Sequence, residues 1–141
     1  MAEIAYEPKL SPESDAAIGR ALIGFNLSQV PDFPAPETIG LVLRHPDSGA
    51  VDGGLTARIS FNRMFVEMLV VPERLRGQGV GRTLMEQAES VARERGCTGI
   101  WLDTFTFQAP GFYQKLGYSV FGELADYPPG HSRVFFHKHL S

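Results

Sequence analysis

A basic, glycine-rich segment at residues 70–82, Val-Val-Pro-Glu-Arg-Leu-Arg-Gly-Gln-Gly-Val-Gly-Arg, constrains the fold more than any other feature. The apolar run before it is typical of a buried strand, and the pattern after it is typical of an amphipathic helix. Glycines let backbone amides approach a ligand without an intervening Cβ, and a helix N-terminus attracts anions. Arg74, Arg76 and Arg82 add positive charge. The segment therefore predicts a strand–loop–helix unit whose loop holds a pyrophosphate.

Two common phosphate-binding motifs do not fit this loop. A P-loop ends in Gly-Lys-Ser/Thr, whereas Gly81 is followed by an arginine. The dinucleotide fingerprint spaces its glycines G-x-G-x-x-G, whereas those at 77, 79 and 81 are spaced G-x-G-x-G. Arg76-x-x-Gly79-x-Gly81 instead resembles the Q/R-x-x-G-x-G/A signature of the GNAT family of N-acetyltransferases. In that family the loop binds the pyrophosphate of acetyl-CoA. The alternative is a glycine-rich turn that binds nothing.

Length and composition set broad bounds. The 141 residues, 43% of them hydrophobic, predict a single globular domain over residues 1–141. A net charge of −3 argues against a nucleic-acid partner. Cys97 is the only cysteine, which favours a reducing compartment. The chain shows neither a secretory leader pattern nor an apolar run that would span a membrane, so we expect a cytoplasmic protein.

The hydrophobic patterns predict a mixed α/β fold with a central sheet of about seven strands. Gly19 and Gly24 weaken the first predicted helix, so we expect it to be short or broken. On the strand at 63–71, Met64, Val66, Met68 and Val70 share one face, and Glu67 lies among Phe65, Leu69 and Val71 on the other. Strands are expected at 3–7, 38–45, 50–61, 63–71, 99–106, 118–124 and 131–139, and helices after a Ser11 cap, at 79–95 and at 109–116. The order coincides with that of the GNAT family, which implies splayed central strands that form the acetyl-CoA cleft.

A second block, Ala109-Pro-Gly-Phe-Tyr-Gln-Lys-Leu-Gly-Tyr118, resembles the family's A-x-x-F-Y-x-K-L-G-F/Y segment. The match makes Tyr113 the candidate general acid that protonates the leaving thiolate of CoA. The competing interpretation is ordinary aromatic packing on a short helix. The family often has an asparagine seven residues before this tyrosine, and here that position is Thr106.

The resemblance also implies a set of acetyl-CoA contacts. Acetyl-CoA is expected as the co-substrate, and no residues have the spacing of a metal site. The pantetheine and the thioester carbonyl would meet the backbone of one strand, and the pyrophosphate would lie on the loop. The implied contacts are Leu69, Val70, Val71, Arg76, Gly77, Gln78, Gly79, Val80, Gly81, Arg82, Thr106 and Ala109.

Acetyl transfer to an amine requires a proton acceptor. A lysine-like amine with a pKa of about 10.4 is deprotonated in only about one molecule in 2,500 at pH 7, a handicap of roughly 4.6 kcal/mol. Glu67 is the best-placed carboxylate, half-buried on a mainly apolar strand face where it would accept a proton readily. The alternative is a structural role, in which Glu67 forms an ion pair with Arg58 or Arg63 and takes no part in the reaction. Asp103, His131 and an ordered water are the other candidate bases.

Three classes of function follow from these patterns. The first is an N-acetyltransferase that moves the acetyl group from acetyl-CoA to a primary amine of a small molecule or peptide by direct attack. The second is a non-catalytic acyl-CoA-binding module on the same fold. The third is an interaction domain that uses an exposed sheet edge. We also expect a homodimer, because the strand at 131–139 and Leu140 are rich in apolar side chains, including Val134, Phe135 and Phe136.

Overall fold

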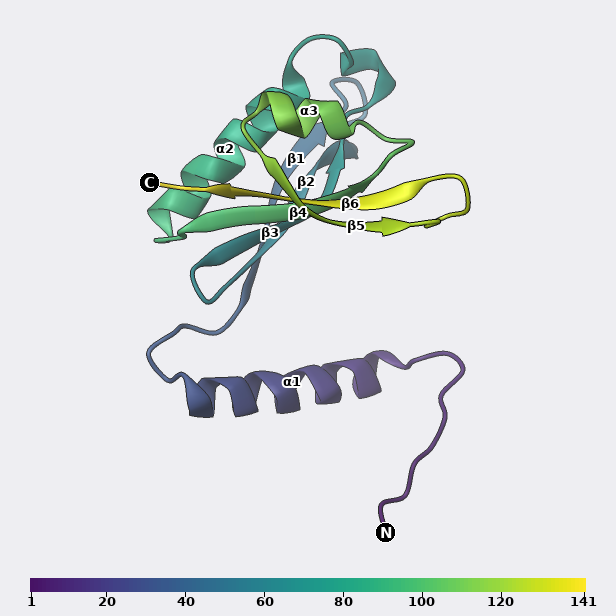
Figure 1. Cartoon of the computed structure of the whole chain (residues 1–141), viewed down its shortest axis with the longest axis vertical. Coiled ribbons are helices and arrows are strands. Elements are labelled where there is room, and N and C mark those ends of the chain that lie inside the picture. The colour runs from purple at the N-terminus through teal and green to yellow at the C-terminus, as the bar shows by residue number, and fades with distance from the viewer. The chain divides into compact units, whose positions relative to one another are not determined.

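The computed structural model describes all 141 residues, which form two compact units, residues 1–35 and 36–141 (Figure 1). The first unit holds one helix, α1 (Pro12–Gln29). Its predicted cap is confirmed, because the Ser11 hydroxyl accepts a hydrogen bond of 3.1 Å from the Ser14 amide. The expected break is wrong: α1 continues for 18 residues through Gly19 and Gly24. A helical glycine costs only about 1 kcal/mol relative to alanine, so two do not end a helix.

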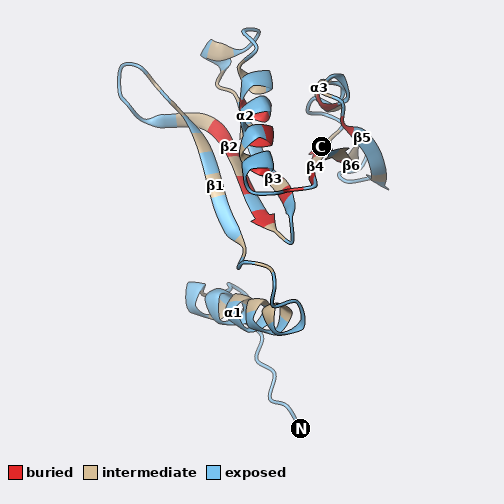
Figure 2. Ribbon diagram, turned by 90° about the vertical axis from the view of Figure 1, so that its left-hand side faces the viewer, coloured by how far each residue is buried: buried red, intermediate tan, exposed pale blue.

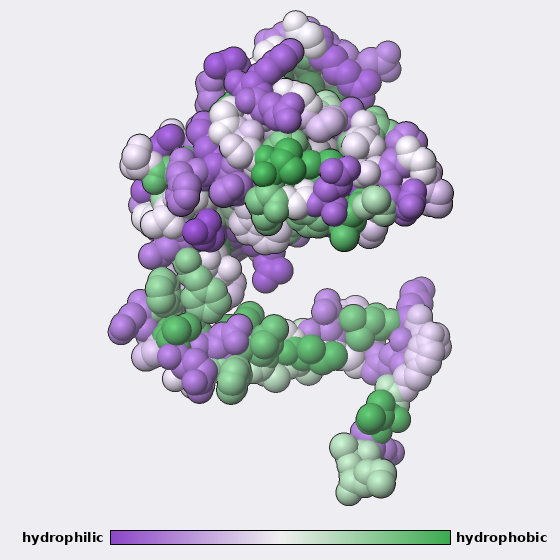
Figure 3. All heavy atoms as spheres, viewed as in Figure 1, coloured by the Kyte–Doolittle hydropathy of each residue, from purple (hydrophilic) through white to green (hydrophobic).

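The predicted strand at residues 3–7 is absent, and the segment has no regular secondary structure. The Glu7 carboxylate instead accepts hydrogen bonds from the Ser11 amide at 3.1 Å and the Ser14 hydroxyl at 2.6 Å. These contacts place Glu7 at the start of α1, while Ile4 and Tyr6 stay exposed. The helix shows apolar side chains at its surface, among them Ile18 and Leu22 (Figure 3). No helix of the chain combines the length and apolarity that a bilayer crossing requires.

The second unit is a mixed sheet of six strands in the order β1-β2-β3-β4-β6-β5. Only the β3–β4 pair is parallel, and the other four pairs are antiparallel. The mixed sheet is confirmed, with six strands rather than seven. The strands are β1 (Glu37–Arg44), β2 (Val51–Ser60), β3 (Arg63–Val70), β4 (Gly99–Phe105), β5 (Ser119–Ala125) and β6 (Ser132–His139). A 3₁₀ turn (Glu73–Leu75) and α2 (Val80–Glu94) connect β3 to β4, and α3 (Pro110–Lys115) precedes β5.

The core lies between the sheet and α2. Four α2 residues, Leu84, Met85, Ala88 and Ala92, are buried against β3 and β4, and Figure 2 shows the buried positions on the helix face turned to the sheet. This spacing places one apolar stripe along the helix. Gly96 follows α2 with φ +74°, the left-handed conformation expected after a helix end. Gly79 precedes α2 with φ +76°, so a left-handed glycine flanks the helix at each end.

A β-bulge at Glu67 changes the direction in which β3 presents its side chains. Val66 pairs with Ala57 and Met68 with Thr56, so Glu67 has no partner on β2. Met64 and Val66 are buried before the bulge, as predicted, but after it Leu69 and Val71 pack against the core. Met68 and Val70 are exposed, so the prediction that they share one face with Met64 and Val66 is wrong. The extra residue reverses the alternation.

Most of the apolar residues of β6 are packed within the chain. β6 lies between β4 and β5, and Val134, Phe136 and Leu140 are buried in the core. Phe135, on the opposite face of the sheet, is only partly buried and lies beside the exposed Phe121. The homodimer stays a prediction, and light scattering at tens of micromolar protein tests it: a dimer mass supports it and a monomer mass contradicts it.

Candidate active site

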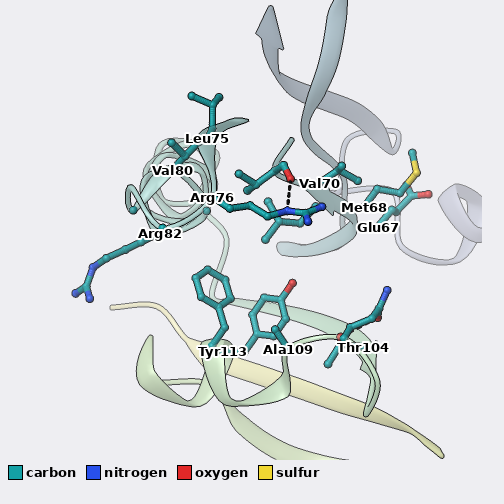
Figure 4. Close-up of a pocket in the computed structure, with 17 residues that line it drawn as sticks. Glu67, Met68, Val70, Leu75, Arg76, Val80, Arg82, Thr104, Ala109 and Tyr113 are labelled. Carbon is teal, nitrogen blue, oxygen red and sulfur yellow. Dashed lines mark hydrogen bonds between the residues drawn. The ribbon is translucent and has the colours of Figure 1, made fainter. Parts of the chain in front are cut away.

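A cavity of about 680 Å³ opens where β3 and β4 separate. The two strands pair only from Arg63–Gly99 to Val66–Leu102, and the residues beyond that point face each other across the cavity. Its volume lies in the range of small-molecule and cofactor sites. Figure 4 shows β3 and the glycine loop on one side and Thr104 and Tyr113 on the other. The lining residues are Glu67–Val71, Leu75–Gly77, Gly79–Arg82, Thr104, Gln108, Ala109, Phe112 and Tyr113.

One end of the cavity has the geometry of an anion site. Gly77 and Gly79 both have φ +76°, a conformation that favours glycine. A Cβ at Gly79 would meet no atom within 4 Å, so the space beside its backbone is open. The first turn of α2 contains no acidic residue, and its amides have no partners within the helix. The loop therefore offers N–H groups and a positive helix end to a bound phosphate.

The three arginines of the loop have different surroundings. Arg74 donates to Asp52 at 3.1 and 3.2 Å and does not line the cavity. Arg82 pairs with Glu86 at 2.9 Å on the surface of α2. Arg76 extends across the cavity and donates from Nε to the Val71 carbonyl at 3.2 Å (Figure 4). Arg76 and Arg82 are therefore the two cations available to a ligand in the cavity.

The loop is held in place by close contacts. The side-chain amide of Gln78 donates to the Arg74 carbonyl at 3.2 Å and closes the turn. Gln78 does not line the cavity, although it was expected to contact acetyl-CoA. A Cβ at Gly81 would lie 3.3 Å from Phe112 Cζ and 3.5 Å from Val71 Cγ2. Glycine at 81 thus allows α3 to pack directly against the start of α2.

Tyr113 is packed and also reaches the cavity. Its ring lies 5.0 Å from that of Phe112 and 5.8 Å from that of Phe136, and the residue is 9% exposed. Figure 4 shows its hydroxyl directed into the cavity. Burial, with a smaller effect of the Asp103 charge, raises the pKa of Tyr113 to about 12. The phenol is therefore protonated at neutral pH and is able to donate a proton.

The raised tyrosine pKa predicts an alkaline loss of stability. The folded-state pKa of Tyr113 is about 12 against an ordinary value of 10.0, so its contribution is complete below pH 10 and is lost as pH rises toward 12. Between pH 9 and pH 11, wild-type protein should lose on the order of 1 kcal/mol more than Tyr113→Phe. Denaturant unfolding at pH 9 and pH 11 measures the difference. Equal losses in both proteins would show that the Tyr113 phenol titrates as it does in the unfolded chain.

Glu67 lines the cavity with a partly buried side chain. This side chain is 36% exposed, and Oε1 lies 4.0 Å from Arg58 Nε. The bulge changes its neighbours from those predicted, because Glu67 has no partner on β2 and does not lie in line with Phe65 and Leu69. Figure 4 shows Glu67 and Met68 at the end of the cavity opposite Arg82. The cavity thus has Arg82 at one end, the Arg76 side chain across its middle and a carboxylate at the other end.

The other candidate bases do not line the cavity. Asp103 pairs with Arg133 at 2.8 Å, and its side chain is 13% exposed. Nδ1 of His131 lies 3.5 Å from the Thr106 hydroxyl. Thr106, expected to contact the pantetheine, accepts from the Ser132 amide at 3.0 Å and also lies outside the lining. All of these side chains belong to the junction of β4 and β6.

Five lining residues were not among the predicted contacts. Met68 and Leu75 were missed because the bulge and the 3₁₀ turn decide which way they face. Phe112 was predicted as packing only. Alternation along β4, with Trp101 and Asp103 only partly buried and Leu102 buried, could have placed Thr104 on the cavity side. The fifth, Gln108, has no comparable signal because it lies in a turn.

The model of the Acetyltransferase (GNAT) family matches residues 14–118. The chain belongs to this family. As a GNAT acetyltransferase it takes the acetyl group from acetyl-CoA, and the charged loop and the cavity fit that co-substrate. It contains no cluster of His, Cys, Asp and Glu residues that would hold a metal ion.

Individual relatives agree with this assignment. A blasticidin-S acetyltransferase of Streptomyces morookaense is 42% identical over 85 residues, which cover 60% of this chain and 62% of that protein, so the match spans less than two thirds of that relative. An acetyltransferase of Agrobacterium fabrum is 32% identical over 126 residues, or 89% of this chain and 90% of the relative. The crystal structure of an acetyltransferase from Bacillus cereus superposes with a TM-score of 0.80 at 35% identity and covers 96% of this chain and 98% of its own.

Proposed function

We propose that this acetyltransferase transfers the acetyl group to a primary amine of a small molecule by direct attack on the thioester. One observation carries the proposal: a single cavity brings together the anion-binding loop, the protonated Tyr113 and the carboxylate of Glu67. Acetyl-CoA would place its pyrophosphate on Gly77–Arg82 and its pantetheine along the backbone of Leu69–Val71. The thioester would then lie beside the Tyr113 hydroxyl.

The chemistry of the cavity's own residues follows from this placement. The amine nitrogen forms a bond to the thioester carbonyl carbon, the C–S bond breaks, and the sulfur leaves as a thiolate. Glu67 accepts one proton from the ammonium form of the acceptor, directly or through water, and Tyr113 gives its proton to the thiolate. The second N–H proton, lost as the amide forms, restores the Tyr113 phenol. Burial raises the pKa of the Cys97 thiol, and Cys97 does not line the cavity, so no cysteine nucleophile takes part in the transfer.

The acceptor is proposed to be cationic before it reacts. Glu67 is the only carboxylate that lines the cavity, and it lies at the end opposite Arg82. This division of charge directs the phosphates to one end and an ammonium group to the other. The name of the Streptomyces morookaense relative makes blasticidin-S the first acceptor to assay.

Replacing Glu67 with glutamine tests its role as the base. We expect the Glu67→Gln protein to lose activity most strongly near neutral pH, because glutamine keeps the size and removes the basicity. The loss should shrink at alkaline pH, where more of the amine is already deprotonated. The measurement is kcat/KM against pH with the best acceptor.

The ion pair with Arg58 gives the competing explanation and the control. An Arg58→Gln variant breaks the same 4.0 Å pair and leaves the carboxylate in place. If Glu67 is only structural, both variants should lose the same thermal stability, and both should keep the wild-type pH profile. That outcome would reject Glu67 as the base and leave a water held by backbone carbonyls as the acceptor of the proton.

A further inference from the structure

Gln108 lines the cavity at a position that the sequence patterns leave without a role. It lies in the turn between β4 and α3, where its backbone N–H donates to the Phe105 carbonyl at 2.9 Å. Its side-chain oxygen accepts two hydrogen bonds of 2.9 Å, one from the Thr104 hydroxyl and one from the Phe105 backbone amide. The side chain is therefore fixed at both its backbone and its tip.

These contacts determine which way the carboxamide points. A backbone N–H only donates, so the atom that faces the Phe105 amide must be the oxygen of Gln108. The oxygen then accepts from the Thr104 hydroxyl as well. The –NH₂ group has no protein partner, so it is an oriented donor that remains free for a ligand.

This donor lies near Glu67, at the end of the cavity where the acceptor amine is proposed to bind. Thr104, which holds Gln108, lies in Figure 4 at the same end as Glu67 and Met68, away from Arg82. A ligand at this end meets a carboxylate on β3 and an amide donor beside β4. These groups match a molecule that has both an ammonium nitrogen and an oxygen acceptor.

We propose that Gln108 is a specificity-determining residue that donates a hydrogen bond to a carbonyl oxygen of the acceptor amine. The inference rests on the proposed function and names the acceptor more closely: a primary amine with a carbonyl oxygen in the same molecule. Gln108 is exposed at the rim of the cavity, and an amine that lacks the oxygen does not form this hydrogen bond, which reduces its rate of acetylation relative to an amine that has it.

The test uses Gln108→Glu and pairs of probe amines. Glutamate keeps the oxygen that accepts from Thr104 and Phe105 and replaces only the –NH₂ group with an acceptor. The probes are the methyl esters of glycine, β-alanine and γ-aminobutyrate. Each is paired with an alkyl amine of similar size and shape that has a hydrocarbon group in place of the ester. The ratio of kcat/KM within each pair, compared between variant and wild type, cancels differences in amine pKa and the added negative charge. Gln114→Glu is the control, because Gln114 is exposed on α3 and does not line the cavity.

At the best spacing, the ester-to-alkyl ratio should fall about tenfold or more in Gln108→Glu, the effect of exchanging one hydrogen bond for a repulsive contact. It should stay at the wild-type value in Gln114→Glu, and both variants should bind acetyl-CoA as wild type does. An unchanged ratio in Gln108→Glu would overturn the inference. If acetyl-CoA binding were weakened at the same time, the –NH₂ group would be assigned to the co-substrate instead. A wild-type protein that acetylates none of the probes and no other amine would overturn the proposed function as well.

Discussion

Tyr113→Phe should lower kcat by about 10²- to 10⁴-fold, the usual contribution of general acid–base catalysis, while acetyl-CoA binding stays near the wild-type value. The substitution removes the hydroxyl that faces the cavity and leaves the ring in its packing against Phe112 and Phe136. Because the pKa of Tyr113 is raised to about 12, the proton is present throughout the neutral range. Single-turnover rates measure the chemical step directly.

Tyr118 provides a matched control for this substitution. It is buried like Tyr113, and burial raises the pKa of its hydroxyl as well, but that hydroxyl donates to Glu89 at 3.0 Å and does not reach the cavity. Tyr118→Phe should lower thermal stability and leave the single-turnover rate unchanged. Equal single-turnover rates in wild type and Tyr113→Phe would remove Tyr113 from the mechanism.

Gly79→Val should abolish acetyl-CoA binding. Valine at φ +76° places a branched side chain in the open space beside the loop backbone, where the phosphates would approach. Wild type should bind with micromolar affinity, and acetyl-CoA at about 100 times its Kd should add roughly 2.7 kcal/mol to the free energy of unfolding. Calorimetric titration and thermal melts measure both effects.

Gly96→Val is the control that separates the effect of Gly79→Val on acetyl-CoA binding from its effect on backbone strain. Gly96 has φ +74°, has no atom within 4 Å of its Cβ position, and follows the opposite end of the same helix. Both variants should lose similar thermal stability, because both force a β-branched residue into the left-handed region. Only Gly79→Val should lose the ligand-induced rise in melting temperature. Wild-type affinity in a folded Gly79→Val protein would show that the loop does not hold the pyrophosphate.

The local parts of the site could be predicted from sequence. The glycine spacing, the apolar strand before it and the α2 pattern all act within a few residues, so the strand, the loop and the helix appear where expected. The Ser11 cap and the left-handed Gly96 follow from the same kind of local rule. These signals need no knowledge of which strands are neighbours.

Two of the errors in the site concern features that depend on partners elsewhere in the chain. The bulge at Glu67 is defined by the register against β2, so alternation along β3 alone placed Met68 and Val70 on the wrong face. Thr106 is turned away from the cavity by the Ser132 amide on β6. Gln108 is a different case, because it is held by the nearby Thr104 and Phe105 at the end of β4, in a turn that no sequence pattern announces.

The central claim is acetyl transfer to an amine in this cavity, and a labelled-transfer experiment tests it most directly. Wild-type protein, Gly79→Val and Gly96→Val would be incubated with acetyl-CoA labelled with carbon-13 in the acetyl group and with a panel of primary amines that includes blasticidin-S, and the amines would then be examined by mass spectrometry. The labelled acetyl group should appear on at least one amine with wild type and Gly96→Val and should be absent with Gly79→Val. Tight binding of acetyl-CoA without label on any amine would contradict the claim and identify a module that binds acyl-CoA without transferring the acyl group.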